Sequence, residues 1–330
     1  WDFFRGPRDS LARPSGSQPN PQGAPQTSHA VYAQNITELG ERLALTLGMR
    51  AQRLKQSASQ SEYTDHTGWY RPAMSGHSVD TREAYEAGIS YRAEGWKVYG
   101  RVGTTYRFPN TDELYGLDPT TWDPVFVLGL RPQHGTVYEI GASKQVARGS
   151  LSLSIYQQNL KDEITSDPMG GNMNVDKTRR LGSELSASLG LTDNLRGNLG
   201  VTLEDAEIRD GVYAGKEVPL VPRVQASAGL TWSKTSNAAY SARLNYVGDR
   251  RYGDDYANEA GHLAAYTRLD LLASWQIRDW KIDAKVLNAT DEKYAAYAGY
   301  GFNMDTFAND TFYYPADRRT YAVSARYDFR

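Results

Sequence analysis

The residues with the most chemical potential in this 330-residue chain are aromatic and basic side chains gathered in a few segments. The chain holds 23 Tyr and 7 Trp but no cysteine, which excludes disulfides and thiolate chemistry. Aromatic rings beside a few positive charges suit the binding of a bulky anionic complex. The candidate ligand-binding residues are Tyr63, His66, Trp69, Tyr70, Arg71, Tyr115, Trp122, Arg250, Arg251, Tyr252, Tyr256, Tyr297, Tyr300 and Phe302. The alternative is that these rings pack loops against one another or form an outer aromatic girdle.

No arrangement typical of an enzyme accompanies these residues. The sequence contains no Gly-x-Ser-x-Gly, no His-Glu-x-x-His and no phosphate-binding loop. His262 with Asp254 is the nearest approach to a hydrolase pair. The Asp254–Asp255 pair lacks the glycine and the final glutamate of a calcium loop. We therefore expect no catalytic residue, no metal site, no cofactor and no enzymatic activity.

Amphipathic β-strands are the elements that must position the candidate residues. From about residue 29 onward, thirteen runs carry apolar residues at every second position, the period of a strand with one apolar face. In the run 181–189, Leu185 and Leu189 alternate with Glu184 and Ser188. Charged residues on the second face of many runs indicate that this face is wet.

The links between the strands alternate strictly between short and long. The short links are 37–40, 93–95, 147–148, 191–194, 234–237 and 277–279. The long links are 53–79, 107–134, 161–176, 207–221, 249–264 and 289–317. A soluble sandwich has no reason to keep its long loops at one end, whereas a membrane β-barrel does. The predicted fold class is all-β, a transmembrane antiparallel β-barrel.

The composition agrees with this class. The mean hydropathy is −0.62, and no stretch approaches the roughly 18 apolar residues of a membrane helix. A barrel strand needs only about 9–11 residues and shows lipid every second side chain. The net charge of −2 gives no electrostatic case for nucleic acid.

Aromatic residues near strand ends predict an interfacial girdle on the short-turn side. They are Trp96, Trp232, Trp275, Trp280, Tyr327 and Phe329. The alternative, corner residues of a soluble core, leaves the alternation of the loops unexplained.

Three stretches resemble the TonB-dependent outer-membrane receptors. Residues 106–116 (YRFPNTDELYG) are similar to that family's Phe-Arg-Ala-Pro box with its Glu-Leu-Tyr tail, although Phe108 stands where the family usually has Ala. Residues 130–141 (LRPQHGTVYEIG) resemble its Leu-Lys-Pro-Glu entry into the next strand, and residues 286–329 resemble its last two strands. The resemblance spans about 106–330, and residues 29–105 agree only in pattern.

This resemblance implies about 13–14 strands of a 22-stranded barrel. It also implies that the plug domain, which contacts TonB in the family, is absent from the chain. We expect residues 1–28 to be a flexible Pro/Gly/Ser-rich loop or linker, and residues 29–330 to be the C-terminal part of the barrel. A strand within residues 1–12 would make the count fourteen.

The resemblance further implies TonB-dependent uptake of a ferric siderophore across the outer membrane of a Gram-negative bacterium, with a periplasmic C-terminus. The expected partners are the TonB complex through the missing plug, outer-membrane lipid, the ferric siderophore and the barrel-assembly machinery, which would read Tyr327 and Phe329. A plug-less passive pore remains an alternative, as do haem and cobalamin as ligands. Family haem receptors place a ligand histidine between the first two stretches, and residues 110–130 hold none.

Overall fold

A computed structural model of the protein describes residues 22–64, 68, 70–117, 124–126, 129–167, 171–303 and 305–329. Its long strands are β2 (Gln26–Leu39), β3 (Leu43–Gln60), β6 (Met74–Ala93), β7 (Trp96–Arg107), β10 (Gln133–Val146), β11 (Gly149–Ser166), β12 (Asn172–Gly190), β13 (Leu195–Ile208), β14 (Val224–Thr235), β15 (Ala238–Val247), β18 (Tyr266–Ile277), β19 (Trp280–Leu287) and β22 (Thr320–Tyr327). The alternation of side chains predicted each of these strands. Among the described residues, no helix has the length and apolar character required to cross a bilayer.

The long strands form one antiparallel sheet in the order β3-β6-β7-β10-β11-β12-β13-β14-β15-β18-β19-β22, with β2 on the outer side of β3. The short strand β1 (Gln22–Gly23) pairs with the far end of β3, so β1 and β2 are one strand interrupted near Pro25. The sheet therefore has 13 strand positions, as the sequence predicted. Because β1 starts at Gln22 and β2 at Gln26, this strand begins within residues 1–28, which the sequence predicted to be a loop or linker.

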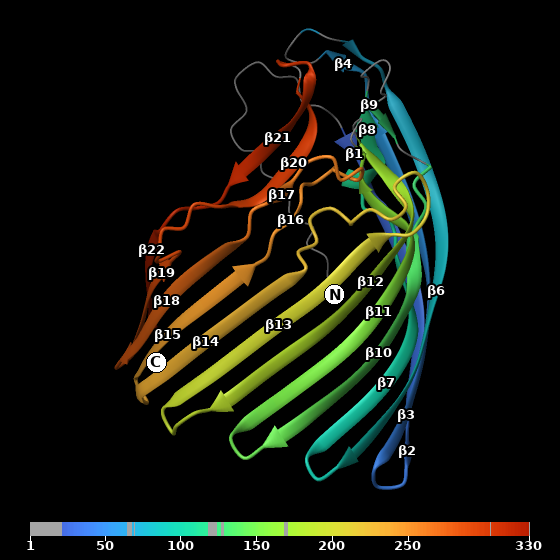
Figure 1. Ribbon diagram of the computed structural model, residues 1–330. Coiled ribbons are helices and arrows are strands. Elements are labelled where there is room, and N and C mark those ends of the chain that lie inside the picture. The colour runs from blue at the N-terminus through green and yellow to red at the C-terminus, as the bar shows by residue number, and fades with distance from the viewer. Residues whose placement is uncertain are drawn as a thin grey trace.

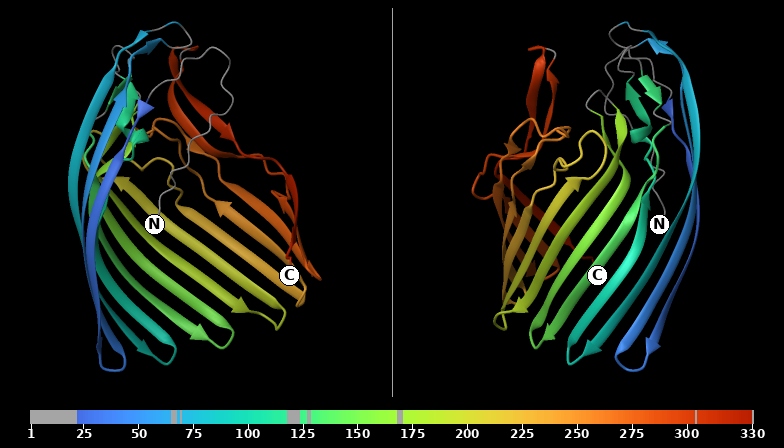
Figure 2. Two further views of the ribbon diagram at one scale, coloured as in Figure 1. Left: turned by 180° about the vertical axis from the view of Figure 1, so that it is seen from behind. Right: turned by 45° about the vertical axis from the view of Figure 1, so that its right-hand side comes forward.

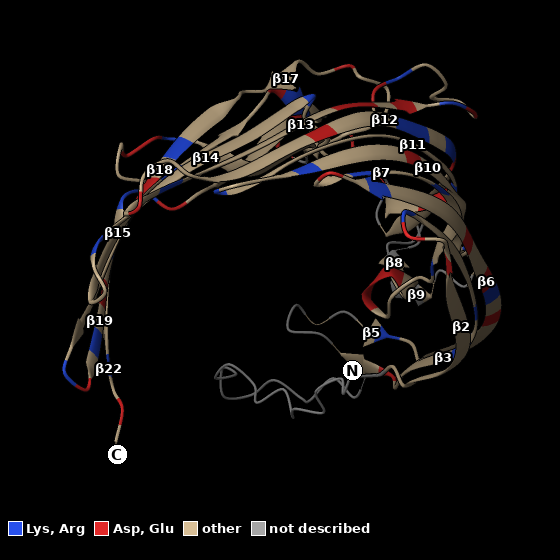
Figure 3. Ribbon diagram, turned by 90° about the horizontal axis from the view of Figure 1, so that it is seen from below, with Lys and Arg blue, Asp and Glu red and all other residues tan. Residues whose placement is uncertain are grey.

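The sheet curves into an open arc rather than a closed barrel (Figure 3). Strand β2 pairs only with β3, and β22 pairs only with β19. Both edges therefore carry backbone groups without a neighbouring strand, within the part of the chain that the structure describes.

Side chains on the convex face of the arc are apolar in a belt that crosses the strands. Gln56 of β3 donates to the carbonyl of Pro109, 2.9 Å away, and the segment that follows Pro109 lies inside the arc as β8 and β9 (Figure 3). The even-numbered residues of β3 thus face the concave side and the odd-numbered ones the convex side. The ladder carries this parity along the sheet, since Leu47 pairs with Ala87 and Ala87 with Val102. Alternation within each strand is therefore apolar outside and polar inside, as in a membrane barrel.

The aromatic residues of the short-turn end form a girdle on the convex face. The ring of Tyr240 lies 5.7 Å from Trp232 and 6.0 Å from Trp275, whose indole N–H donates to the Tyr240 hydroxyl at 3.1 Å. Near the C-terminus, Trp280, Tyr327 and Phe329 form a second chain of rings. Rings with one apolar and one wet end suit the boundary between hydrocarbon and water, which confirms the predicted girdle.

Short turns and long loops lie at opposite ends of the sheet (Figures 1 and 2). The amide of Asp328 donates to the carbonyl of Asp279 at 3.0 Å, so the C-terminal end lies beside a short turn. Some long loops are shorter than predicted: β3 reaches Gln60, and β11 and β12 are separated only by 167–171. The reason is that strand pairing continues beyond the apolar belt, where polar side chains no longer mark the alternation.

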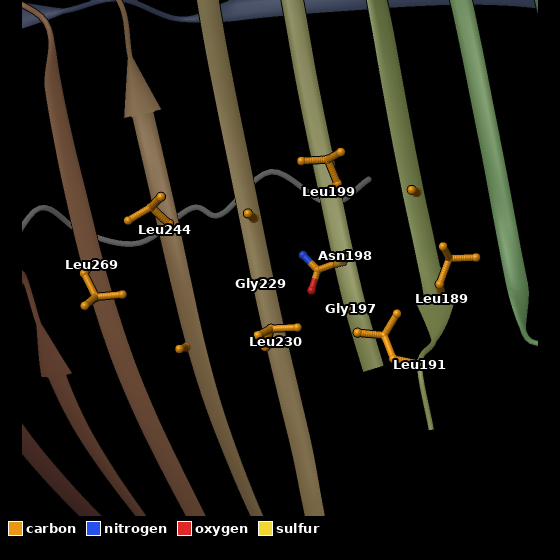
Figure 4. A pocket seen from close by; sticks show the side chains of 12 residues that line it. Leu189, Leu191, Gly197, Asn198, Leu199, Gly229, Leu230, Leu244 and Leu269 are labelled. Carbon is orange, nitrogen blue, oxygen red and sulfur yellow. The ribbon is translucent and has the colours of Figure 1, made fainter. Parts of the chain in front are cut away.

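The convex wall is uneven. A shallow apolar depression of about 410 Å³ lies over β12–β18 towards the short turns (Figure 4). Leucines border it, and Ala187, Ala228 and Ala242 form its floor. Because it opens on the apolar belt, the depression matches acyl chains and not a polar solute.

Candidate functional site

The long-loop end contains both clusters of buried apolar residues found among the described residues. The first joins Val175 of β12 and Ile208 of β13 to Tyr256 of the loop between β15 and β18. The second joins Tyr252 and Leu263 of that same loop to Ala298 of β20 (Ala295–Asn303). Loop 248–265 therefore lies between the strand ends of β12–β13 and the neighbouring hairpin, and it holds both in place.

Tyr256 is one of the predicted ligand residues that the structure buries. Its side chain is 4% exposed, and its hydroxyl donates to the carbonyl of Ser166 at 3.0 Å. Its ring lies 5.7 Å from Tyr213. Burial raises the pKa of Tyr256 to about 12, and at 4% exposure the ring is closed to a solute in this structure.

Tyr252 is buried as well, on the other side of the same loop. It is 7% exposed, its hydroxyl shares a hydrogen bond of 2.8 Å with Tyr313, and burial raises its pKa to about 12. Arg250 is 5% exposed; it donates to the carbonyl of Ala296 at 2.9 Å and lies over the ring of Tyr266. Burial lowers the pKa of Arg250. These contacts fix the loop, and both predicted ligand residues are buried within it.

The hairpin of β20 and β21 (Ala308–Pro315) rises from the end of the sheet and docks on this loop (Figure 1). The amide of Gly253 donates to the carbonyl of Ala298, and the amide of Tyr300 donates to the carbonyl of Gly253, both at 2.8 Å. A Cβ on Gly253 would stand 2.7 Å from the hydroxyl of Tyr297, so a glycine is needed for this close approach. The two loops therefore form one unit.

Glu217, which the sequence did not single out, is the charged centre of this unit. Arg251 donates to its carboxylate at 2.6 Å, His262 lies 3.3 Å from it, and Arg223 also pairs with it. Burial would raise the pKa of Glu217, but the hydrogen bond from Arg251 and the charge of Arg223 outweigh it and lower the pKa. Arg251 therefore forms its ion pair within the loops. Glu217 could be recognised only from the residues that surround it in space.

The aromatic residues left accessible gather on the hairpin. Tyr300 lies 3.5 Å from the carboxylate of Glu259, and Tyr297 packs edge-on against Tyr314. Exposed rings on the hairpin are Tyr297 (38%), Phe302 (54%), Phe307 (76%), Phe312 (42%), Tyr313 (53%) and Tyr314 (64%). Among the predicted ligand residues of this region, Phe302 is thus the most accessible to a solute.

The loop between β3 and β6 holds a second, smaller group. Tyr63 of β4 (Tyr63–Thr64) pairs with Arg71 of β5 (Tyr70–Arg71). Tyr70 is 61% exposed and donates to Glu62 at 2.8 Å, a hydrogen bond that raises its pKa. The predicted ligand residues His66 and Trp69 of this loop lie outside the described residues.

The loop between β7 and β10 turns into the concave side. Arg107 donates to both carboxylate oxygens of Glu113, at 2.7 and 2.8 Å, and Glu113 caps the amide of Asn110. Tyr115 of β8 (Tyr115–Leu117) stacks edge-on with Phe126 of β9 (Pro124–Phe126) at 4.8 Å. The stretch similar to the family box thus begins on a strand and ends as an anchor inside the arc. The predicted ligand residue Trp122 lies outside the described residues.

The concave wall carries a ladder of tyrosines and charges that the candidate residues did not include. Tyr99 donates to Glu139 at 2.5 Å, and Arg101 pairs with the same carboxylate. Farther along the sheet, Tyr156 of β11 donates to Glu204 of β13. The strand parity, which assigns these side chains to the wet face, was the signal that could have found them. The concave wall also carries ion pairs within single strands: Arg268–Asp270 at 2.9 Å, Lys281–Asp283 at 3.9 Å and Arg326–Asp328 at 3.1 Å.

The nearest hydrolase pair in the sequence is not assembled. His262 lies against Glu217 and Asp249, whereas Asp254 accepts a hydrogen bond from Ser166. Asp255 accepts backbone amides from Glu259 and Ala260, so its carboxylate closes a turn. In the described part of these loops, the side chains interact with protein groups in the manner of a binding scaffold and not of a catalytic centre.

Comparisons with known proteins agree with this geometry. Residues 1–289 match the family profile described as TonB dependent receptor-like, beta-barrel. An iron-regulated outer membrane virulence protein of Vibrio cholerae is 25% identical over 263 residues, which cover 70% of this chain and 40% of that protein. The chain therefore spans less than half the length of this relative.

Two solved structures share the fold. The ferric yersiniabactin uptake receptor FyuA from Yersinia pestis has a TM-score of 0.72 at 22% identity and covers 94% of this chain and 46% of its own. The ferric-catecholate import receptor Fiu from K12 E. coli has a TM-score of 0.69 at 18% identity, and the match covers 92% of this chain and 45% of Fiu. Family proteins of this kind are outer-membrane receptors and transporters rather than enzymes. The chain belongs to the TonB-dependent receptor family, and its strands belong to the β-barrel of that family.

Proposed function

We propose that this chain forms the wall and part of the extracellular mouth of a receptor that takes up a ferric siderophore. The observation that carries the proposal is the docked loop unit, which presents exposed rings such as Phe302 and Tyr314 at the long-loop end of the sheet. Because these rings are already held in place, binding a bulky chelate does not cost the entropy of ordering the loops. The named functions of the relatives support iron as the cargo.

The orientation belongs to the same proposal. Barrels of this class keep their short turns in the periplasm and their long loops outside the cell. Since Asp328 bonds to the short turn at Asp279, the C-terminus would be periplasmic. TonB would supply energy through a plug domain outside residues 1–330, and the barrel-assembly machinery would read Tyr327 and Phe329.

A binding assay tests the ligand class. The full-length protein is titrated with a ferric catecholate, a ferric hydroxamate, ferric citrate and haem, and the quenching of tryptophan fluorescence gives each Kd. We expect one ferric siderophore to bind, and the triple variant F302A/F307A/Y314A to raise its Kd at least about tenfold. The matched control Y91A removes a half-exposed ring from the convex wall and should leave the Kd unchanged.

Two results would overturn the proposal. If haem alone binds, the ligand class is wrong. If none of the four binds and the protein conducts ions freely in a planar bilayer, the passive pore is the better description.

A further inference from the structure

The ladder between β6 and β7 stops halfway up the wall. These strands pair from Ala93↔Trp96 only as far as Glu86↔Gly103. Above that point β6 stays with β3 up to Met74, and β7 stays with β10. A last contact, the amide of Tyr85 donating to Thr104 at 2.9 Å, marks the point of separation. A cavity of about 770 Å³ opens there.

This cavity faces mainly the convex side. Lys161 of β11 pairs with Lys177 of β12, and Asn159 pairs with Arg179. These residues have the same parity as Leu181, which belongs to the apolar belt directly below them on β12. The cavity, here called the basic outer pocket, is lined by Thr81, Arg82, Glu83, Tyr85, Thr104, Thr105, His134, Gly135, Thr136, Asn159, Leu160, Lys161, Lys177, Thr178, Arg179 and Arg209.

The charge of the basic outer pocket is positive. Five cationic side chains line it against one carboxylate, that of Glu83. Lys177 pairs with Asp210, and Arg179 and Arg209 share Glu207 at 3.0 and 2.7 Å, which leaves an excess of positive charge. Lys161 is exposed, and no carboxylate of the described residues forms an ion pair with it.

The pocket lies where a membrane lipid changes from chain to head. Tyr85 and Tyr138, 51% and 50% exposed, stand at the top of the apolar belt on the convex face. Leu181 lies four positions after Lys177 on β12, about 13 Å along the strand. A soluble anion would use the cations only, whereas a lipid would also use the apolar wall beneath them.

We propose that the basic outer pocket binds the phosphate-bearing headgroup of an outer-leaflet membrane lipid, whose acyl chains lie on the apolar belt below. Cations near an anionic lipid surface contribute about 1 kcal/mol each, so Lys161 and Lys177 together correspond to about 30-fold in affinity. This surface faces away from the concave side and does not take part in the proposed uptake, but its assignment to the outer leaflet rests on the orientation given under the proposed function.

The test uses the full-length protein in mixed micelles of a neutral detergent. Diphosphorylated lipid A and its fully dephosphorylated form are the probes, with binding measured by native mass spectrometry. We expect the dephosphorylated lipid to bind at least tenfold more weakly. The variant K161Q/K177Q should lose about 30-fold for the phosphorylated lipid.

The control is K281Q/K285Q, which removes the same charge from the concave wall. It is matched residue by residue, because Lys281 pairs with Asp283 as Lys177 pairs with Asp210. It should bind the phosphorylated lipid like the unaltered protein. If K161Q/K177Q does not fold, K161R/K177R keeps the charge and should retain binding.

Three outcomes overturn the proposal. Equal binding of both lipids would show that phosphate is not recognised. An equal loss in both glutamine variants would show only a general effect of net charge. Displacement of the lipid by millimolar inorganic phosphate would identify a site for the free anion instead.

Discussion

At the scale of single residues, a glycine and a tyrosine on adjacent strands fit together on the concave wall. Tyr156 of β11 pairs with Gly182 of β12, and a Cβ on Gly182 would stand 2.4 Å from the ring. The ring therefore lies flat across the glycine and reaches Glu204 on the next strand. The absence of a side chain at Gly182 makes the Tyr156–Glu204 hydrogen bond possible.

Gly182→Ala should destabilise the protein by about 1–3 kcal/mol, because the added methyl group displaces the ring. Gly100→Ala is the control, since its Cβ would meet Ile140 at an ordinary 3.8 Å. Urea unfolding in phospholipid vesicles measures both. In a Tyr156→Ala background the cost of Gly182→Ala should vanish, and a persistent cost would refute the interpretation.

Asn288 is a second residue of this kind, because its one side chain holds several backbone groups in place. It is 2% exposed, donates to the carbonyls of Glu292 and Asp317 at 2.9 and 3.2 Å, and accepts the amide of Glu292. It thereby joins the two ends of the segment that carries the β20–β21 hairpin. Asn288→Ala leaves these groups unpaired.

We expect Asn288→Ala to cost about 2 kcal/mol of local stability. Limited proteolysis should cleave residues 289–319 faster than in the unaltered protein, with the rest of the sheet protected. Asn309→Ala, which changes an exposed side chain of the same hairpin, should leave the rate unchanged. Equal rates for both variants would contradict the role assigned to Asn288.

The same segment should respond to pH through Asp291. The hydrogen bond from Arg318 and the amide of Arg319 lower the pKa of Asp291 to about 2. Because the folded-state pKa is depressed, the stabilisation is present above the ordinary value of about 4 and is lost as pH falls towards 2.

Hydrogen exchange of residues 289–319, corrected for intrinsic rates, should therefore accelerate between pH 4 and 2. Asp291→Asn should already exchange fast at pH 7 and lose this pH dependence. If it kept the same acid transition as the unaltered protein, another carboxylate would be responsible.

At the scale of elements, the last strand ends in rings that contribute little to packing. Phe329 is 90% exposed, and its ring lies 4.8 Å from Tyr327 on the short-turn side. Its replacement should therefore affect assembly more than stability.

We expect Phe329→Ala to lower the amount of folded protein in the outer membrane severalfold, while the melting temperature of the recovered protein hardly changes. Immunoblots of membrane fractions and a thermal melt separate these two effects. Phe312→Ala, a ring on the hairpin, is the control for assembly. An unchanged yield would remove Phe329 from the predicted assembly signal.

At the scale of the whole molecule, the arc has two open edges, β2 and β22. Open strands with exposed apolar faces invite pairing with other strands. Residues 1–330 purified alone in detergent should therefore form mixed oligomers, as measured by analytical ultracentrifugation. A single monodisperse monomer would mean that the edges close on one another.

The sequence by itself determined the strands, their two faces and the side on which the loops are long. Each of these follows from residues two positions apart or from the spacing of neighbouring runs, as in the alternation of Leu185 with Glu184. The girdle followed as well, because Trp232 and Trp280 mark strand ends next to short turns. It also predicted the number of strands, because each strand crosses the apolar belt once.

Only the tertiary structure decided which loop residues are accessible. Tyr252 and Tyr256 look like Phe302 in the sequence, yet two are buried and one is exposed. The burial of Tyr252 and Tyr256 depends on their partners Tyr313 and Ser166, which are 61 and 90 residues away in the sequence. The separation of β6 from β7 likewise depends on which neighbour each strand follows. The local periodicity of the sequence does not specify contacts between such distant segments. These contacts determine the shape of the mouth and of the basic outer pocket.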